Sequence, residues 1–359
     1  MKMSKIIIDC DAGTDDALAL YLLLVAHKEG RVYIEAVTCV FGNTTVDNVV
    51  KNVYRVLELF EDYDIPVYKG AYSPLMNNNS DGFLSDKDYV HGLDGFGDVY
   101  TNEPDINRMR MAHAAYALQK HTTDNLNDIS IVCLGPLTNI ALTIKLYPDF
   151  ASNIKDIFIM GGNCTGHGNI KSHAEFNFYC DPESASIVLN NISKPIYMLP
   201  WETCLKSRIT DDWRWKTLGS INTPFVEMLN KIEEGCLRIK KEKKTQYYVV
   251  CDAILAGIVL RPEMARNTYS RYVDVELNGS KTRGQVVIDH LQERKANVFL
   301  IDDFDSEILK ELLHFVANPD EKNNEVLFPQ ILTTPTSHVL LNRDQSEDSV
   351  YDQLEVDLL

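Results

Sequence analysis

The chain has 359 residues and a mass of 40.7 kDa, which exceeds a common domain of roughly 100 to 200 residues but suits one large α/β domain. Apolar residues make up 45% and charged residues 24% of the sequence, so neither a wholly disordered chain nor a collagen-like repeat is indicated. The 35 basic and 52 acidic side chains give a net charge of −17. This charge argues against a nucleic-acid or anionic-membrane surface, because both require clustered Lys and Arg.

Short β-branched runs alternate with helical patterns in the first half of the chain. The sequence predicts, in order, a strand at 6–10, a helix at 16–27, a strand at 32–40, a helix at 45–60, a strand at 65–68, a helix at 106–121, a strand at 129–134, a helix at 137–146 and a strand at 157–160. This alternation implies right-handed crossovers and a mainly parallel sheet with helices on both faces. Sites in such folds lie at the carboxyl ends of the strands.

Two regions interrupt the alternation. Residues 69–102 are rich in Gly, Asn and Asp and include the run VHGLDGFGD, which predicts a long loop of the kind that is either functional or disordered. After about residue 320 the pattern gives way to polar and acidic residues. We therefore expect a single domain over residues 1–330 and an acidic C-terminal tail over residues 331–359.

The cysteines and the N-terminus bear on the compartment. The eight cysteines are scattered, without a CxxC pair or a Cys/His cluster of zinc-ligand spacing, which indicates free thiols in a reducing compartment. The N-terminal run of three isoleucines is too short for a secretory signal or for a membrane span of about 20 apolar residues. We expect a cytoplasmic protein that does not bind membranes.

Four carboxylates, those of Asp9, Asp11, Asp15 and Asp16, fall within eight residues between the first predicted strand and helix. Such crowding raises carboxyl pKa values and is repulsive unless a cation neutralises it. Oxygen ligands favour Ca²⁺ or Mg²⁺ over zinc, and Gly13 permits a tight turn between Asp11 and Asp16. The alternative interpretation is that Asp15 and Asp16 only complement the positive end of a helix dipole.

This run resembles the DxDxGxDD motif of the inosine-uridine-preferring nucleoside hydrolases, which use a bound Ca²⁺ to release a nucleobase from a ribonucleoside. Further blocks follow in the family's order: FGN at 41–43, LGPLTN at 134–139, MGG at 160–162, GN at 168–169, AEFN at 174–177, DP at 181–182, CDA at 251–253 and TRG at 282–284. The resemblance covers roughly residues 4–320. It implies a Rossmann-like nucleoside hydrolase fold and Ca²⁺-dependent hydrolysis of the N-glycosidic bond.

The resemblance also implies roles for individual residues around the metal. Asp11 would bind Ca²⁺, orient the attacking water and take its proton, because the ion lowers the pKa of bound water. Asp16 would chelate the ion with both oxygens, and Asp252 would supply another carboxylate. The backbone carbonyl of Leu134 would complete the protein ligands, and Asn43 would steady the water or the groups around the metal.

Ribose recognition would fall mainly to acid and amide side chains, because a vicinal diol donates to carboxylates and accepts from amides. The substrate-contacting residues implied by the resemblance are Asp15, His91, Met160, Asn169, Glu175, Asn177, Cys251 and Asp252. Taken singly, the Asn and Glu side chains of this set are better explained as caps of loops and turns. A lone His in a glycine-rich loop is usually solvated.

One residue departs from the family's pattern. The position before the last metal-binding Asp carries His in one branch of the family and Trp in another, whereas this chain has Cys251. A thiol with a pKa of about 8.5 is a weak proton donor, so the way the leaving base is activated does not carry over. The base could instead stack on an aromatic ring, and the candidates are Tyr247, Tyr248, Phe83 and Phe96. Because purines accept a proton at N7 more readily than uracil does, we expect activity to lean towards purine nucleosides.

Two alternatives stay open at this point. A haloacid-dehalogenase-like phosphatase also carries Asp-x-Asp after its first strand, but it has Thr or Val where Gly13 stands. A catalytically inactive, Ca²⁺-dependent nucleoside-binding protein would have a damaged set of acids, whereas Asp11, Asp16 and Asp252 are all present. The resemblance further implies a homo-oligomer, either a dimer or a tetramer.

Overall fold

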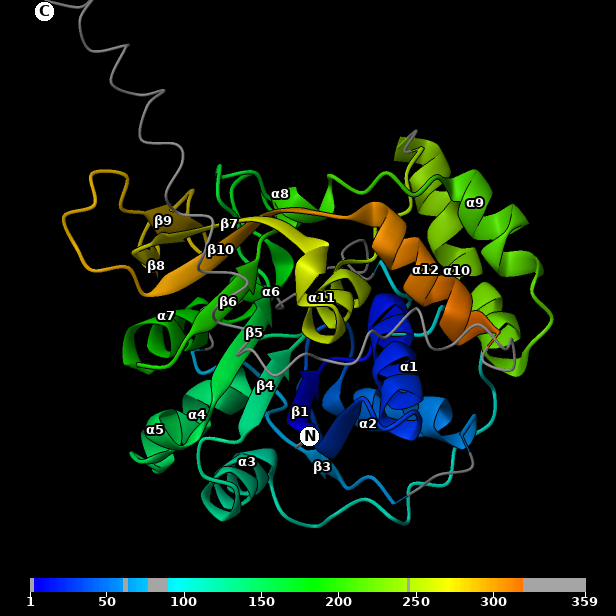
Figure 1. Cartoon of the computed structure of the whole chain (residues 1–359), viewed down its shortest axis with the longest axis horizontal. Coiled ribbons are helices and arrows are strands. Elements are labelled where there is room, and N and C mark those ends of the chain that lie inside the picture. The colour runs from blue at the N-terminus through cyan, green and yellow to red at the C-terminus, as the bar shows by residue number, and fades with distance from the viewer. Residues whose placement is uncertain (1–2, 61–63, 77–89, 244–245, 319–359) are drawn as a thin grey trace, which may run out of the picture.

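The computed structural model describes residues 3–60, 64–76, 90–243 and 246–318, with side chains 235–243 left out. Eight strands form one central sheet in the order β3-β2-β1-β4-β5-β6-β10-β7, and β7 alone runs antiparallel to its neighbour in this described sheet (Figure 1). The strands of this sheet are β1 (Ser4–Cys10), β2 (Val32–Cys39), β3 (Val67–Lys69), β4 (Ile129–Cys133), β5 (Asp156–Met160), β6 (Ile196–Leu199), β7 (Ala265–Arg271) and β10 (Val298–Phe304). A separate antiparallel pair consists of β8 (Val273–Val275) and β9 (Val286–Ile288).

Helices connect the strands and cover both faces of the sheet (Figure 1). They are α1 (Thr14–Lys28), α2 (Val46–Glu58), α3 (Ala114–Asp124), α4 (Thr138–Leu146), α5 (Phe150–Asn153), α6 (Phe176–Cys180), α7 (Pro182–Asn191), α8 (Trp201–Cys204), α9 (Asp211–Lys216), α10 (Pro224–Lys243), α11 (Cys251–Leu260) and α12 (Ser306–Ala317), with short 3₁₀ turns η1 (Leu218–Ser220) and η2 (Pro262–Met264). The predicted α/β class, with a mainly parallel sheet, is confirmed.

The sheet separates two hydrophobic cores. Along β1, Ile6 and Ile8 belong to the core beneath α1, α2, α10, α11 and α12, whereas Ile7 belongs to the core beneath α3, α4 and α7. This alternation follows from the two-residue period of a strand. Each fully buried aliphatic side chain contributes about 1.5–3 kcal/mol, so a strand that is buried on both faces is strongly held in register.

Helix α1 is apolar on nearly all sides because it is enclosed by other elements. It packs against the sheet and against α11, and nearly all of its side chains from Ala17 to Ala26 are fully buried. Its N-terminus points to the carboxyl end of β1, so Asp15 and Asp16 in the first turn are brought to the edge where a site was predicted.

The predicted helix at 106–121 begins later than expected. The amide of Arg110 donates to the carbonyl of Val67 at 2.9 Å, and Arg110 pairs in parallel with Tyr68, so this segment follows the edge of the sheet. Helix α3 starts only at Ala114, after His113, whose Nδ1 accepts from the amide of Ala115. The segment before Ala114 therefore pairs, through Arg110, with the backbone of β3 at the sheet edge and does not form the first turns of the predicted helix.

Several other expectations can be compared with the described residues. The seven cysteines whose side chains are described are free thiols. No described helix is long and apolar enough to cross a membrane. The acidic tail expected over residues 331–359 lies outside the described residues.

Candidate active site

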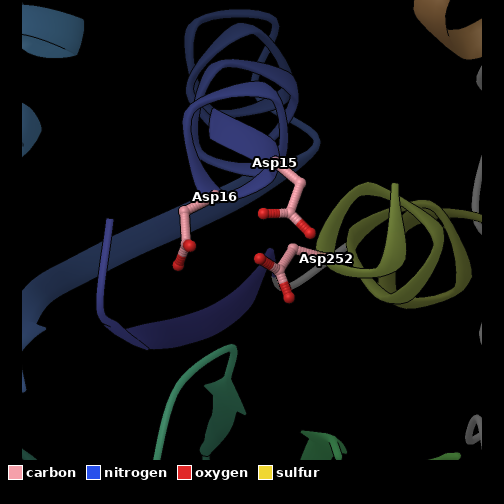
Figure 2. A group of neighbouring side chains, drawn as sticks. All are labelled: Asp15, Asp16 and Asp252. Carbon is pink, nitrogen blue, oxygen red and sulfur yellow. The ribbon is translucent and has the colours of Figure 1, made fainter. Parts of the chain in front are cut away.

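Acidic side chains from two helices converge at the carboxyl edge of the sheet. Asp15 and Asp16 lie in the first turn of α1, and Asp252 lies in the first turn of α11 (Figure 2). One carboxylate oxygen from each of the three lies within 4.8 Å of the others, an arrangement that can hold a metal ion. Asp11 follows β1 directly and raises the pKa of Asp252 by its charge, which places it next to this group.

The carboxylates are buried and incompletely paired. Asp11 and Asp16 are fully buried, and Asp252 is 3% exposed. Among the described residues, Oδ1 of Asp11, Asp15 and Asp16 has no hydrogen-bond partner. Burial first, and the neighbouring carboxylates second, raise the pKa of Asp16 to about 7 and hold the pKa values of Asp11 and Asp252 well above the ordinary value. Buried carboxylate oxygens without hydrogen-bond partners, in or beside a group of clustered acids, fit a hard divalent cation.

Two glycines fix the position of the Asp11 carboxylate. A Cβ added at Gly42 would lie 2.1 Å from Oδ2 of Asp11, and a Cβ at Gly135 would lie 2.9 Å from Oδ1 and from Cγ. Oδ2 also accepts from the backbone amide of Asn43 at 2.8 Å. Glycine at both positions, as in the motifs that resemble the family, therefore leaves the space that the Asp11 carboxylate occupies.

The turn between Asp11 and α1 is held in an unfavourable conformation. Ala12 has a φ of +35°, which is costly for a residue with a Cβ. Its carbonyl accepts from Nδ2 of buried Asn52 at 3.1 Å. The amide of Gly13 donates to Oδ2 of Asp16 at 2.8 Å, and Nδ2 of Asn43 donates to the same oxygen at 3.2 Å. Asn43 therefore lies beside the acids, where the sequence predicted it.

Asp9 differs from the other acids of the run. Its Oδ1 accepts from Oγ1 of Thr38 at 2.5 Å and from Nδ2 of Asn139 at 2.8 Å. Burial raises its pKa to about 7, against these two hydrogen bonds. Asp9 therefore links β1 to β2 and α4 and is not part of the three-acid group. Of the four acids that are close in the sequence, this one has a structural role.

Leu134 and Met160 lie at the carboxyl ends of β4 and β5, and Asn177 joins them. Nδ2 of Asn177 donates to the carbonyls of Leu134 at 2.8 Å and of Met160 at 3.1 Å. The Leu134 carbonyl predicted as a metal ligand therefore already accepts one hydrogen bond, and its second lone pair is the one a cation could use. With Nδ2 engaged, the amide oxygen of Asn177 is the atom that could accept from a sugar hydroxyl.

Glu175 is the N-cap of α6. Its carboxylate accepts from the amides of Gly162 at 2.9 Å, Asn177 at 2.9 Å and Phe178 at 3.1 Å. Burial raises its pKa to about 7 against these three bonds. The capping interpretation is therefore seen directly. A carboxylate offers about four acceptor sites, so one remains for the ribose contact that the sequence predicted.

The other predicted substrate residues lie in two loops. Asn169 is exposed in the loop after β5. His91 is partly buried against the first turn of α1: its Nδ1 accepts from the amide of Thr14 at 3.1 Å and lies 2.7 Å from Oγ1 of Thr14. Nε2 of His91 lies 3.7 Å from Oδ1 of Asp15. His91 thus contacts the acidic group and is not simply solvated.

The leaving-group side is less aromatic than expected. Cys251 is 7% exposed and forms a hydrogen bond with Cys204, which together with burial holds its pKa well above the ordinary value. Phe96 is fully buried, and Tyr248 is buried with its hydroxyl donating to Glu233 at 2.5 Å, so neither ring is placed to stack on a base. Tyr247 is 47% exposed. Phe83 lies outside the described residues.

Some residues around the site were not identified from the sequence. Asn139, which donates a hydrogen bond to Asp9, is the last residue of the GPLTN block, so the motif was a signal that could have identified it. Asn52 lies in the middle of α2, and Glu202 lies in the four-residue helix α8. Neither occurs in a motif, and their partners are remote in the chain, so no signal pointed to them.

The sequence and the fold were compared with those of known proteins. The model of the family described as inosine-uridine preferring nucleoside hydrolase matches residues 6–311. The pyrimidine-specific ribonucleoside hydrolase RihA of Salmonella schwarzengrund (strain CVM19633) is 34% identical over 323 residues, which cover 87% of this chain and 99% of the relative. RihA of Escherichia coli O1:K1 / APEC is 33% identical over 315 residues, covering 86% and 96%.

Solved structures show the same fold. An inosine-guanosine nucleoside hydrolase is 30% identical with a TM-score of 0.77, over 87% of this chain and 98% of that one. The plant nucleoside hydrolase PpNRh1 is 25% identical with a TM-score of 0.80, over 88% and 99%. The chain belongs to the inosine-uridine preferring nucleoside hydrolase family. It is accordingly an N-glycosidase, a ribonucleoside hydrolase.

Proposed function

We propose that this enzyme hydrolyses ribonucleosides to ribose and free base with one bound Ca²⁺ and prefers purine nucleosides. The observation that carries the metal requirement is the set of buried carboxylate oxygens without hydrogen-bond partners on Asp11, Asp15 and Asp16, next to Asp252. Burial and mutual repulsion raise the pKa values of Asp11, Asp16 and Asp252, so full ionisation of these three acids is unfavourable without a cation. An oxygen-only set fits Ca²⁺ better than zinc.

Asp11, Asp16, Asp252 and the carbonyl of Leu134 would hold the ion, which would supply a Lewis acid that lowers the pKa of a nearby water. In this mechanism Asp11 orients the attacking water and takes its proton as the water oxygen forms a bond to C1′ of ribose. The N-glycosidic bond breaks, its electrons pass to the base, and the base gains a proton. Asn43, which donates to Asp11 and Asp16, keeps these two acids in register.

Ribose is held, in this proposal, by Asp15, Asn169, Glu175 and Asn177, with His91 and Met160 at the edges of the sugar site. Because the set includes buried polar groups, a sugar that lacks a hydroxyl leaves some of them without a partner. Ribonucleosides should therefore be cleaved faster than 2′-deoxyribonucleosides by orders of magnitude in kcat/KM. Equal rates on inosine and 2′-deoxyinosine would contradict this assignment.

The proposed purine preference rests on Cys251. Its thiol is hydrogen-bonded to Cys204 and has a raised pKa, so it donates a proton poorly. A purine, which can accept a proton from solvent at N7, should therefore leave faster than a pyrimidine. The relatives differ in this respect: RihA is named pyrimidine-specific, and the solved relative is named for inosine and guanosine. Rates on inosine and uridine, measured side by side, decide the matter. A clear preference for uridine would overturn the purine part.

The test of the whole proposal is release of free ribose from inosine by the purified chain. Activity should disappear after exhaustive chelation and return with Ca²⁺, and elemental analysis should find one ion per chain. Asp11→Asn should keep the fold and substrate binding but lower kcat by about 10² or more. Full activity in the metal-free protein would refute the metal requirement, and binding of nucleoside without hydrolysis would favour the inactive binding protein.

Assembly and compartment complete the proposal. We infer that the protein forms a dimer or tetramer and lies in the cytoplasm. The seven described cysteines are free thiols, which supports the reducing compartment but does not bear on the assembly. Light scattering of the purified protein measures the assembly, and a monomer at micromolar concentration would contradict it.

A further inference from the structure

The loop after β5 is organised by one side chain from α8, the short helix that follows β6. Glu202, in α8 directly after β6, accepts four hydrogen bonds from this loop. Its Oε2 accepts from the amide of Cys164 at 2.9 Å, and its Oε1 accepts from the amide of Thr165 at 2.8 Å, from Oγ1 of Thr165 at 2.8 Å and from the amide of His167 at 3.2 Å. Three backbone amides and one hydroxyl of the same loop thus share one carboxylate.

These bonds matter because residues 163–168 form no helix or strand. Backbone amides in such a segment need partners outside regular structure, and a carboxylate makes stronger hydrogen bonds to them than a neutral acceptor does. The neighbouring backbone is attached to β6 as well, since the amide of Gly161 donates to Leu199 at 3.1 Å and the amide of Trp201 donates to Gly162 at 3.0 Å. Glu202 therefore extends the link between β5 and β6 beyond the end of the sheet.

The held segment leads directly to Asn169. Gly168 enters a tight turn in which its amide donates to the carbonyl of Ser172 at 3.1 Å, and a Cβ there would lie 1.9 Å from the carbonyl of Lys171. Buried Asn163 fixes the same loop from inside, donating to the carbonyl of His173 at 2.8 Å and accepting from the amide of Val286. With both Asn163 and Glu202 in place, the loop has little freedom to move Asn169 independently.

We propose that Glu202 is a positioning residue for ribose binding, acting through the loop 163–168 on Asn169. The inference rests on the proposed function in one respect, the contact between Asn169 and ribose. It assigns Glu202 no contact with the sugar, the metal or the reacting atoms. Its expected effect is on affinity for the sugar, because the acids that hold the metal and activate the water come from other elements, α1, α11 and the end of β1.

The test uses direct binding of D-ribose as well as hydrolysis of inosine. Glu202→Ala should weaken ribose binding and raise the KM for inosine about tenfold, with kcat lowered less than threefold and Ca²⁺ affinity unchanged, because an interaction that serves binding alone appears in KM. Tenfold corresponds to about 1.4 kcal/mol, the size of one hydrogen bond. Glu202→Gln keeps one acceptor oxygen and should recover part of the loss.

Two comparisons separate positioning from general destabilisation. Asp305 caps α12 by accepting from the amides of Glu307 and Ile308, so Asp305→Ala removes a similar carboxylate–backbone contact elsewhere and should leave ribose binding unchanged. In a double-mutant cycle, Glu202→Ala should add little to Asn169→Ala, because both act through the same contact. Hydrogen exchange of the amides of Cys164, Thr165 and His167 should become faster in Glu202→Ala.

The outcomes are distinct for the two proposals. If the wild-type chain binds ribose but releases none from any nucleoside, the proposed function fails, and the effect of Glu202→Ala on ribose affinity still tests the positioning role. Unchanged ribose affinity in Glu202→Ala, full additivity with Asn169→Ala, or an equal loss in Asp305→Ala would overturn the inference about Glu202. A wild-type chain that neither releases ribose from inosine nor binds ribose would overturn both.

Discussion

Gly42→Ala tests whether the position of the Asp11 carboxylate limits the rate. The new Cβ would lie 2.1 Å from Oδ2, 2.8 Å from Cγ and 2.9 Å from Cβ of Asp11, whereas real contacts of a Cβ are essentially never shorter than 3.0 Å. The carboxylate must therefore move by about 1 Å. Gly135 lies on the side of Oδ1, where a Cβ added to that glycine would be 2.9 Å from the oxygen, so the carboxylate has little room to move in that direction.

A displacement of about 1 Å at a catalytic group costs about 10²-fold in rate, or about 2.7 kcal/mol. We expect Gly42→Ala to lower kcat on inosine by this factor, with the KM changed far less. The same shift weakens the hydrogen bond from the Asn43 amide to Oδ2, so the affinity for Ca²⁺ should fall as well. Steady-state kinetics and calcium titration of the purified variant measure both effects.

The matched control is Gly30→Ala at the other end of α1. Gly30 has a φ of +69°, so alanine strains the backbone there, but no atom lies within 4 Å of the added Cβ. This variant should lose some thermal stability and keep the wild-type kcat. A folded Gly42→Ala protein with the wild-type kcat and calcium affinity would refute the reasoning, because the Asp11 carboxylate would then tolerate displacement.

Three further predictions concern other parts of the molecule. Cys251→Ala should lower kcat on inosine about tenfold and not by the 10² to 10⁴ expected for a general acid, because the thiol hydrogen-bonded to Cys204 donates a proton poorly. A folded variant whose kcat has fallen by three orders of magnitude would contradict this prediction. Glu233→Gln should lower the free energy of unfolding by about 3–5 kcal/mol in urea titrations, because Arg214, fully buried and 2.8 Å from the Glu233 carboxylate, would lose its counter-charge; a loss below about 1 kcal/mol would contradict it. Burial raises the pKa of Asp156, so its protonated form favours folding and this contribution is lost as the pH rises through the native pKa. Asp156→Asn should therefore gain stability relative to wild type as the pH rises above about 4, and a difference that stays constant with pH would contradict the burial argument.

The strands and helices that the sequence predicted well are those with strong internal patterns. The apolar run 6–10 and the amphipathic run 45–60 correspond to β1 and α2 because burial on two faces or on one face leaves a clear period. The start of α3 was wrong because Arg110 found a backbone partner on β3, which no local pattern records. Pairings between remote segments are set by the fold as a whole, so the antiparallel edge strand β7 had no local signature either.

The site was predictable to the extent that its chemistry is concentrated in one run of acids. Asp15 and Asp16 meet Asp252 as the motifs indicated, because strand ends in a parallel sheet share one edge. The orientation of each side chain was not predictable: Asp9 lies in the same run yet pairs with Thr38 and Asn139. Of the four acids in this run, Asp15 and Asp16 lie in the group with Asp252, Asp11 lies beside that group, and Asp9 forms its hydrogen bonds elsewhere.

Several unfavourable features lie together at this edge of the sheet, and their combination is an argument for function. Ala12 is held at a positive φ, three buried carboxylate oxygens have no hydrogen-bond partner among the described residues, and carboxyl pKa values are raised by burial. Asn52 and Asn43 stabilise this arrangement from neighbouring elements without relieving it. A fold that only needed stability would replace these acids with apolar or neutral residues, since isolated buried charges are costly. A bound cation would offset this cost, so under the proposed function we expect the apo protein to gain thermal stability as well as activity on adding Ca²⁺.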